Sequence, residues 1–401
     1  MQKIERILIV HNYYQSSGGE DTVFASESAL LESFGHQVIK FNVSNDRIRE
    51  MNSFDLAMKT VWNPDIFNEL RILIKKVNPQ IVHFHNTFPL VSPSGYYAAH
   101  SERVPVVQTL HNYRILCLNA LLFRKNLPCD LCIGRTPPWP GVIYKCYRKD
   151  RIASSVVAIM LTYHRMRLTW QKHIDIFIAL SDFAKRKFVQ GGIPAEKIVI
   201  KPNFIYRDPG IGNRQGSYFL YVGRLESEKG IETLLATWRQ VGEEVSLKII
   251  GEGPFLDQTS NTRLPIGVDF LGTLPNHQVI EQMKNATALI FPSKIYEGMP
   301  MSIIEAFAVG LPVIASRIGS MTDLIEDYRT GLLFNPGDEL DLATKINWAL
   351  SHPFEVDQIS QAARREFEHL YSAQRNYELL IKIYTQAIAQ YSDQFSIPGV
   401  R

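Results

Sequence analysis

Short apolar runs alternate with stretches of helical periodicity along almost the whole chain. This alternation is typical of βαβ units, in which parallel strands are joined by helices. The pattern predicts strands over residues 6–10, 37–41, 80–84, 104–109 and 175–180 in the first half and over 218–222, 246–250, 268–271, 288–291, 313–315 and 332–334 in the second. We therefore predict an α/β fold with two doubly wound parallel sheets.

A polar segment rich in glycine and proline, residues 207–216, separates the two sets of strands. Such a segment disfavours regular structure. Together with Lys201-Pro202-Asn203 it predicts an N-terminal domain over 1–202 and a C-terminal domain over 203–391, with 392–401 as a tail. Residues 355–391 contain neither glycine nor proline and predict a long terminal helix.

Composition and charge exclude several classes of protein. The 401 residues are 45% hydrophobic and 21% charged, which is ordinary for a globular chain and unlike a disordered, collagenous or coiled-coil protein. Lysine and arginine number 43 against 40 acidic residues, and a net charge of +3 is too small to indicate nucleic acid as the main partner. The apolar start reads as a strand rather than a signal peptide, so we expect a cytoplasmic protein.

Residues 221–231, YVGRLESEKGI, place two basic side chains in a turn between a predicted strand and a predicted helix. The forked guanidinium of Arg224 and the compact ammonium of Lys229 suit the two phosphates of a nucleotide diphosphate. Alternatively, the segment is a solvated loop in which each cation pairs with a neighbouring glutamate. The residues alone leave both interpretations open.

A second segment, residues 291–313, has the sequence FPSKIYEGMPMSIIEAFAVGLPV. Pro300 suits the first turn of a helix, whose free amides and positive end attract phosphate and sugar oxygens. Glu297 would precede that helix and Glu305 would lie just over one turn inside it. One pocket could use both carboxylates, whereas a structural role for each glutamate is the alternative.

These two segments resemble the signature of glycosyltransferase family 4, whose members are retaining transferases with the GT-B fold of two facing Rossmann-like domains. The resemblance covers essentially the whole chain and implies that Arg224 and Lys229 bind the donor diphosphate. It further implies that Glu297 lies against the donor sugar and that Glu305 holds the ribose hydroxyls. Backbone amides in the same motif would contact sugar and phosphate, namely those of Gly298, Met299, Met301 and Ser302.

Other donor contacts are expected on the same resemblance. Gly18 and Gly19 follow the first strand and could meet the diphosphate, and His111 follows the fourth strand and is expected at the donor sugar. Gly253 and Leu274 lie in turns that the family uses near the nucleotide base. The turn at Gly253 is no dinucleotide fingerprint, because leucine stands at the third glycine position.

The first domain is expected to bind the acceptor. His85 and Asn86, at another polar strand end, are our candidates for acceptor contacts. Residues 113–150 form an insertion longer than a usual crossover. It holds all the cysteines of the chain, Cys117, Cys129, Cys132 and Cys146, which could form a structural zinc site or remain four reduced thiols.

Basic residues gather just beyond the cysteines. Lys145, Arg148, Lys149 and Arg151 lead into a helical stretch over 154–173 that mixes apolar and basic positions. This arrangement suits the anionic inner face of a cell membrane. A core helix with a solvated basic face is the alternative.

The sequence thus predicts a metal-independent, retaining hexosyltransferase that acts on a glycan or lipid-linked glycan, in bacterial surface polysaccharide synthesis. Two other functions remain open. A sugar-nucleotide epimerase of GT-B shape would share the diphosphate site without an acceptor, and a non-catalytic protein would only bind the sugar nucleotide. No catalytic cofactor is expected.

Overall fold

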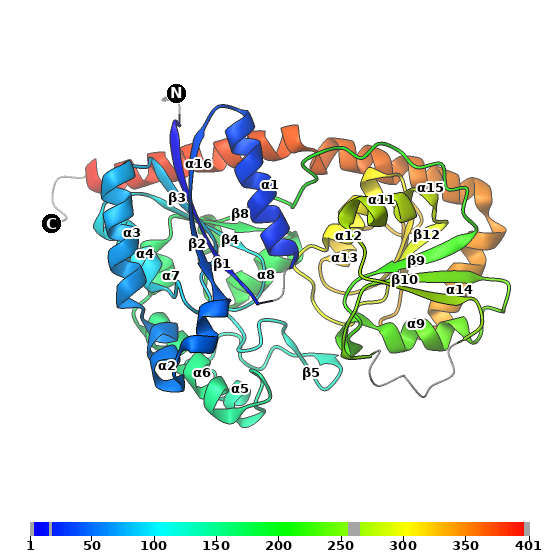
Figure 1. Ribbon diagram of the computed structural model, residues 1–401, viewed down its shortest axis with the longest axis horizontal. Helices are drawn as coiled ribbons and strands as arrows, with labels where there is room; N and C mark the ends of the chain where they lie inside the picture. Colours follow the sequence, from blue (N-terminus) through cyan, green and yellow to red (C-terminus); the bar gives the residue numbers. More distant parts are fainter. Residues whose placement is uncertain (1–3, 16–17, 256–264, 397–401) are drawn as a thin grey trace. The chain divides into compact units, whose positions relative to one another are not determined.

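The computed structural model describes residues 4–15, 18–255 and 265–396 (Figure 1). The chain divides into two compact units. The first comprises Met1–Leu122, Asp130–Pro202 and Asn376–Arg401, and the second comprises Phe123–Cys129 and Asn203–Arg375. Three segments of the chain therefore build the first unit, and the last of them is the terminal helix.

The first unit is built on a parallel sheet whose six strands, among the described residues, run in the order β2-β1-β3-β4-β7-β8. Strands β3 and β4 are buried along their whole length, including the polar residues that they contain. The strands are β1 (Arg6–Tyr13), β2 (Gln37–Ser44), β3 (Ile81–Asn86), β4 (Val106–Leu110), β7 (Ile176–Ala179) and β8 (Ile198–Ile200). The order reverses at β1 and β3, which is where ligands bind in open α/β sheets.

Helices join these strands, and polar side chains begin several of them. Asn63 caps α3, Asp150 caps α6 and Ser181 caps α8, each by accepting a hydrogen bond from a backbone amide of the first turn. The helices are α1 (Gly19–Ser33), α2 (Ser53–Val61), α3 (Pro64–Val77), α4 (Ser94–Ser101), α5 (Trp139–Ile143), α6 (Arg151–Met166), α7 (Thr169–His173) and α8 (Asp182–Gln190), with 3₁₀ turns η1 (Asn45–Glu50) and η2 (Ala195–Lys197).

The terminal helix α16 (Ala373–Ser396) contributes to the core of the first unit. Its Leu380, Ile383 and Tyr384 are buried in a cluster with Ile9 of β1 and Phe24 of α1. Residues 392–396 are helical as well. The rest of the expected tail, 397–401, lies outside the described residues.

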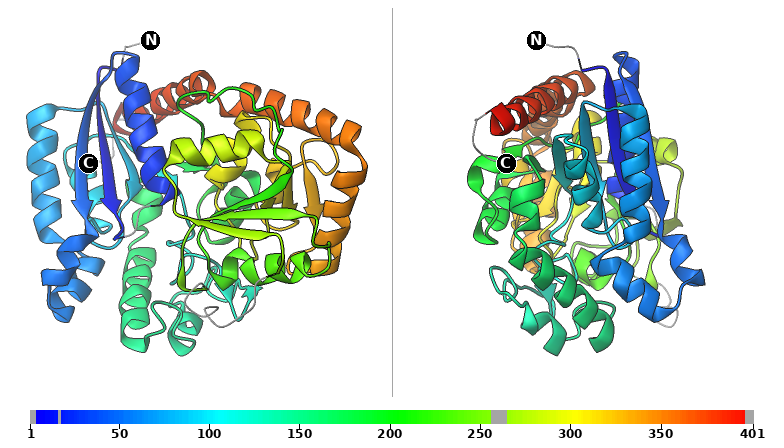
Figure 2. Two further views of the ribbon diagram at one scale, coloured as in Figure 1. Left: turned by 45° about the vertical axis from the view of Figure 1, so that its right-hand side comes forward. Right: turned by 90° about the vertical axis from the view of Figure 1, so that its left-hand side faces the viewer.

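The second unit repeats the architecture, and its described strands form a parallel sheet in the order β11-β10-β9-β12-β13-β14. They are β9 (Tyr218–Val222), β10 (Ser246–Ile250), β11 (Val268–Gly272), β12 (Ala288–Phe291), β13 (Val313–Ser316) and β14 (Leu332–Phe334). The connecting elements are η3 (Ser227–Lys229), α9 (Ile231–Trp238), α11 (Asn276–Asn285), α12 (Met301–Ala308), α13 (Met321–Leu324), α14 (Glu339–Ser351), α15 (Pro353–Glu366) and a π-helical turn, Phe367–Tyr371. Figure 2 shows this sheet with helices on either side.

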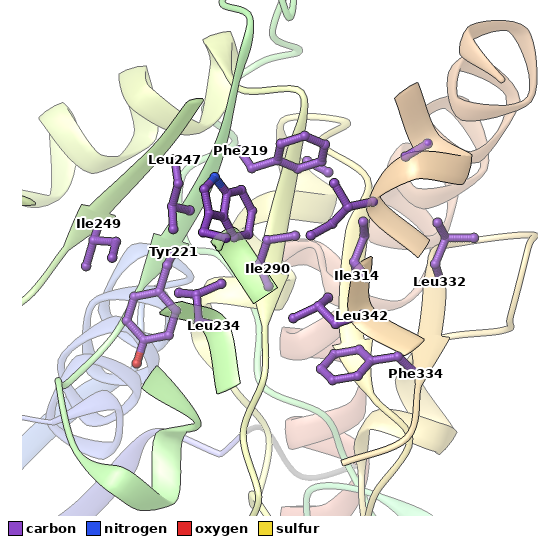
Figure 3. Packing of buried hydrophobic residues seen from close by; sticks show 14 of the residues in the cluster. Phe219, Tyr221, Leu234, Leu247, Ile249, Ile290, Ile314, Leu332, Phe334 and Leu342 are labelled. Carbon is purple, nitrogen blue, oxygen red and sulfur yellow. The ribbon is translucent and has the colours of Figure 1, made fainter. Parts of the chain in front are cut away.

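The core of the second unit lies between the sheet and the helices α9 and α14. Phe219 and Ile290 project from neighbouring strands toward Leu342 of α14 (Figure 3). Trp238 at the end of α9 is buried in the same cluster, and its indole nitrogen donates to the backbone oxygen of Val245 at 2.9 Å. The aromatic ring is therefore buried without leaving its polar atom unpaired.

The predicted α/β fold class is confirmed, and all eleven predicted strands are present. Their ends agree within two residues, except that β1 and β2 each continue three residues further than expected. Two features were not predicted. Strand β8, which has three residues, is one of them, and the other is a small hairpin, β5 (Phe123–Arg124) with β6 (Leu127–Pro128), inside the cysteine-containing insertion.

Two leucines of α14 differ in burial, so we expect unequal effects when each is substituted. Leu342 is fully buried, whereas Leu340 is 65% exposed. We expect Leu342→Ala to lower the free energy of unfolding by about 2–5 kcal/mol, and Leu340→Ala to change it by less than about 0.5 kcal/mol. Chemical denaturation followed by circular dichroism measures both, and equal effects would contradict the assigned core.

Candidate functional site

Three loops meet at the carboxyl edge of the sheet in the second unit. They follow β9, β10 and β12, which are neighbours in the sheet. The amide of Leu225 donates to the backbone oxygen of Glu252 at 2.9 Å, and the amide of Lys294 donates to that of Glu228 at 2.9 Å. These bonds hold the loops that carry both predicted motifs beside one another.

Two glycines make this close approach feasible. Gly230 has a φ of +78°, and a Cβ atom there would lie 1.9 Å from the backbone oxygen of Pro292. Gly251 has a φ of +139°, and its Cβ would lie 1.9 Å from the backbone oxygen of Gly223. Any other residue would force the loops apart, so the local geometry requires glycine at both positions.

The structure brings Lys229 and Glu297 into contact. The Lys229 Nζ lies 2.6 Å from Glu297 Oε1, and the hydroxyl of Ser293 donates to the same oxygen at 2.7 Å. The hydroxyl of Ser320 donates to the backbone oxygen of Glu297 at 2.8 Å. Both members of the ion pair are mostly buried, with side chains 18% and 13% exposed. A cation from the first motif and a carboxylate from the second are thus fixed at one point.

Arg224 lies in the same loop but reaches into solvent. Its side chain is 60% exposed and pairs with Glu226 at 3.0 Å. The hydroxyl of Tyr221 donates to the Arg224 backbone oxygen at 2.8 Å, which anchors the main chain while the guanidinium can turn. A surface pair of this kind is weak, so an anionic ligand can compete for the guanidinium.

Helix α12 begins just after Pro300, which is its N-cap residue. The amides of Gly298, Met301 and Ser302 therefore lie at or next to the helix start, where unpaired N–H groups and the helix dipole favour anions. Glu305 lies one turn further in and accepts a hydrogen bond from Asn276 Nδ2 at 3.0 Å. Burial raises the pKa of Glu305 above its ordinary value.

The remaining donor-side candidates of this unit occupy neighbouring positions. Met299 is buried, and its backbone oxygen accepts from Asn203 Nδ2 at 3.1 Å. Gly253 follows β10 and Leu274 follows β11, so both lie beyond the carboxyl ends of their strands. In the first unit, Gly18 is the N-cap of α1 and Gly19 is its first residue, and both are exposed.

The first unit contains a row of ionisable groups in contact with one another near the carboxyl edge of its sheet. Glu27 of α1 forms an ion pair with Lys201, and both residues are fully buried. Glu27 Oε2 lies 3.4 Å from His85 Nε2, and His85 Nδ1 lies 3.0 Å from His111 Nε2. The row therefore links two predicted residues, His85 and His111, to two that the sequence did not reveal.

The protonation of this row follows from burial and charge. Burial opposes the charge on Glu27, but the ammonium of Lys201 and the neighbouring imidazoles hold the pKa of Glu27 well below its usual range. Burial lowers the pKa of His85 and His111. The group therefore holds one anion, one cation and neutral imidazoles at neutral pH.

Glu20 is a further residue that the sequence analysis missed. Its Oε1 atom accepts a hydrogen bond from the side-chain amide of Asn86, the last residue of β3, and its Oε2 atom accepts one from that of Asn112, which follows β4. Both distances are 3.3 Å. Burial, with the nearby charge of Asp21, raises the pKa of Glu20 to about 8. Its position directly after Gly18-Gly19 was the available signal. The candidate Asn86 is thus joined to a carboxyl group at the sheet edge.

The predicted zinc site is not supported. Among the described residues, the one group of three or more potential ligands close enough to share an ion is Glu27, His83 and His85, and it contains no cysteine. The thiol of Cys117 donates to Asn119 Oδ1 at 3.0 Å and that of Cys132 donates to the backbone oxygen of Pro138 at 3.7 Å.

The group of Glu27, His83 and His85 is a poor cation site as well. Lys201 already neutralises Glu27. The Nδ1 atom of His83 lies 2.8 Å from the hydroxyl of Tyr384, and its Nε2 atom lies 2.8 Å from that of Thr109. Both ring nitrogens of His83 are therefore engaged, and a cation would meet an ammonium at the same carboxylate.

Comparisons with known proteins agree with these motifs. The family model described as Glycosyltransferase Family 4 matches residues 12–208, and the model described as Glycosyl transferases group 1 matches residues 208–366. The sulfoquinovosyl transferase SQD2 of Arabidopsis thaliana is 31% identical over 160 residues, which are 39% of this chain and 31% of that protein. The lipopolysaccharide 1,6-galactosyltransferase of Salmonella typhimurium is 27% identical over 235 residues, which are 55% of this chain and 65% of that protein.

The chain thus spans less than two thirds of the length of either relative. Among solved structures, that of HepE from Anabaena in complex with UDP aligns with a TM-score of 0.68 and 17% identity, over 95% of this chain and 99% of that one. At this identity the likeness concerns the fold.

The buried ion pair predicts a large stability loss when one partner is removed. Lys201→Met leaves the Glu27 carboxylate buried without its counter-ion and should lower the free energy of unfolding by about 3–5 kcal/mol. The matched control is Lys40→Met, because Lys40 pairs with Glu32 at 2.8 Å on the surface. Its loss should cost at most about 1 kcal/mol in the same chemical denaturation experiment. Similar losses for both variants would contradict the account of the buried pair.

Glu20 predicts a specific pH dependence. Its folded-state pKa of about 8 lies above the ordinary value of 4.5, so its contribution to stability is full below 4.5 and is lost as the pH rises through 8. The stability of the wild type relative to Glu20→Gln should therefore fall over this range. Thermal unfolding at several pH values measures this difference, with the exposed Glu69→Gln as the control that should run parallel to the wild type. A parallel profile for Glu20→Gln would be evidence against the raised pKa.

Proposed function

The chain belongs to glycosyltransferase family 4, with the GT-B type of fold, and on this premise we propose that it is a retaining hexosyltransferase. It would move a hexose from a nucleotide-diphosphate sugar to a hydroxyl of a glycan or lipid-linked glycan. The observation that carries the proposal is the contact between Lys229 and Glu297 at the loops after β9 and β12. The polysaccharide-related names of relatives such as the Salmonella galactosyltransferase support a role in bacterial surface polysaccharide synthesis.

The donor diphosphate is assigned to the second unit. As the glycosidic bond breaks, the leaving diphosphate gains negative charge, so fixed cations stabilise the transition state more than the ground state. Arg224 and Lys229 supply two such cations, and the amides at the start of α12 supply oriented dipoles. Lys229 would exchange part of its contact with Glu297 for the phosphate, which places the glutamate next to the bond that breaks.

Glu297 is assigned to the reacting face of the donor sugar. A positive charge develops on the sugar during departure, and a carboxylate nearby favours that charge. The family resemblance assigns His111 to the same sugar and Gly18 and Gly19 to the diphosphate. Attack by the acceptor from the face that the leaving group vacates accounts for retention at the anomeric carbon.

Glu305 is assigned to the ribose of the nucleotide. Its carboxyl lies one helical turn beyond the start of α12 and is oriented by Asn276. A raised pKa suits a group that exchanges hydrogen bonds with hydroxyls, because either protonation state can pair with them. This role is remote from the chemical step.

The acceptor is assigned to the first unit, with His85 and Asn86 as candidates. Asn86 is the more direct of the two, because His85 is buried beneath His111 and would act through that ring. Glu20 joins them as a third acceptor-side group. Its carboxyl faces the amides that end this edge of the sheet.

We further propose that the first unit contacts the anionic inner face of a cell membrane. Among the described helices, none is long and apolar enough to span a bilayer. Ile152, Ile159 and Met166 of α6 are 78%, 58% and 73% exposed, and the basic residues Lys145, Arg148 and Lys149 precede the helix. Apolar side chains next to lysine and arginine are typical of interfacial membrane binding.

A donor-consumption assay with and without acceptor separates the three candidate functions. A transferase consumes nucleotide sugar faster when a glycan acceptor is present, an epimerase converts it without an acceptor, and a binding protein leaves it intact. We expect acceptor-dependent consumption.

We expect substitutions of the two glutamates of the second motif to change different kinetic constants. Glu297→Gln removes a charge used mainly in the transition state, so it should lower kcat by about 10²-fold or more with little change in donor KM. Glu305→Gln should mainly raise the donor KM. Steady-state kinetics with varied donor measures both, and a change confined to donor affinity in Glu297→Gln would contradict its assignment.

A further inference from the structure

A pocket between α2 and α6 has no role in the site described above. Its volume is about 230 Å³, and it lies wholly within the first unit. Leu56 and Ala57 of α2 form one wall, Val156 and Val157 of α6 form the other, and Phe88 lies between them. Pockets for whole drug-sized ligands usually span about 300–1,000 Å³. The size and the apolar walls therefore suit a segment of hydrocarbon chain rather than a sugar nucleotide.

Basic residues stand at one side of this pocket. Arg148 contributes to its lining, and Lys149 follows it. Lys145, Arg148 and Lys149 all have left-handed backbone conformations, with φ of 51°, 53° and 54°. All three residues are exposed, so their side chains are accessible at the surface beside the pocket.

The acidic member of the lining is already engaged. Asp150 accepts a hydrogen bond from the amide of Ala153 at 2.7 Å and caps α6. Its charge therefore serves the helix start, and the turn before it remains a cationic surface. A ligand that fills the pocket and reaches this turn would pair a hydrocarbon chain with an anion.

The two helices that line the pocket also carry exposed apolar side chains. Phe54 and Met58 of α2 are 72% and 57% exposed, and Ile152 of α6 is 78% exposed. Figure 1 shows α2 and α6 side by side at the same end of the first unit, and residues from both helices line the pocket. Ile152 lines the pocket, and Phe54 and Met58 lie on the same helix as its lining residues Leu56 and Ala57, so the two helices that form the pocket also expose apolar side chains suited to a lipid surface.

The pocket is also connected to the acceptor-side residues. The backbone amide of Phe88 donates to Asn86 Oδ1 at 3.0 Å, and Phe88 and Pro89 both line the pocket. Phe88 thus contacts both the pocket and the acceptor-side candidate Asn86. The geometry thus joins an apolar site, a cationic turn and the end of β3.

We propose that this pocket binds the first hydrocarbon units of a lipid phosphate that carries the acceptor, with the phosphate on Arg148 and Lys149. The proposal rests on the proposed transferase function and names its acceptor class: a glycan on a phosphate-linked lipid. The hydrocarbon of the lipid is buried between α2 and α6, and the glycan extends toward Asn86.

Direct binding tests the pocket without any need for transfer. The probe is farnesyl phosphate below its aggregation concentration, titrated into the full chain by calorimetry, with farnesol and inorganic phosphate as separate ligands. We expect farnesyl phosphate to bind at least tenfold more tightly than either. Equal affinity for farnesol and farnesyl phosphate would overturn the role of the basic turn.

Matched variants locate the binding. Ala57→Phe fills the pocket from α2 and Ala153→Phe fills it from α6, and each should weaken binding at least tenfold while keeping the circular dichroism and melting temperature of the wild type. Arg148→Gln should weaken the phosphate ligand but not farnesol. The controls are Ile72→Gln and Arg167→Gln, exposed residues of the first unit that do not line the pocket. Unchanged binding in both folded filling variants, or equal losses in the controls, would overturn the proposal.

Failure of this inference and failure of the proposed function are distinguishable. If the chain consumes donor with a lipid-free glycan but farnesyl phosphate does not bind, the transferase assignment stands and the lipid site is wrong. If farnesyl phosphate binds as expected but no nucleotide sugar is consumed, the lipid site stands and the transferase assignment is wrong.

Discussion

Every strand of each main sheet runs parallel to its neighbours, so the loops that follow the strands must emerge along one edge. In the second unit this constraint places the loops after β9, β10 and β12 beside one another. Gly230 and Gly251 then let backbone approach backbone where a Cβ atom would collide. The contact between Lys229 and Glu297, 68 residues apart, is a consequence of this packing rather than of local sequence. The donor site that we propose depends on the same edge.

The first unit has a buried ion pair near the carboxyl edge of its sheet. It buries Glu27 and Lys201 as a pair, although a buried pair offers little stability over an apolar one of the same volume. Its value lies in what it orients, because Glu27 lies against His85 and His85 lies against His111. In the function that we propose, neutral imidazoles in fixed orientations would suit a sugar, whereas charged ones would repel the cation that develops on it.

Periodicity predicted the α/β class and the strands, and the two motifs predicted the family, because both depend on residues close in sequence. The buried contacts that join Glu27 to Lys201 and to the histidines were not predictable in this way. Glu27 and Lys201 are 174 residues apart in the sequence. Nothing in the sequence distinguishes Lys201 from other lysines, because its contact with Glu27 exists only once α1 packs beside the end of β8. The cysteine spacing misled for the same reason, since proximity in sequence does not bring four sulfurs around one ion. The expected roles of Arg224, Glu297 and Glu305 remain predictions that kinetics must test.

The central claim is that the loops after β9 and β12 hold the diphosphate of a nucleotide, and calorimetric titration tests it most directly. Wild type and Lys229→Met should be titrated with UDP, GDP and ADP and with the matching nucleosides. The account predicts that at least one diphosphate binds the wild type, that its nucleoside binds at least tenfold more weakly, and that Lys229→Met removes most of this preference. Equal binding of diphosphate by both proteins, or no preference for a diphosphate over its nucleoside, would contradict the account.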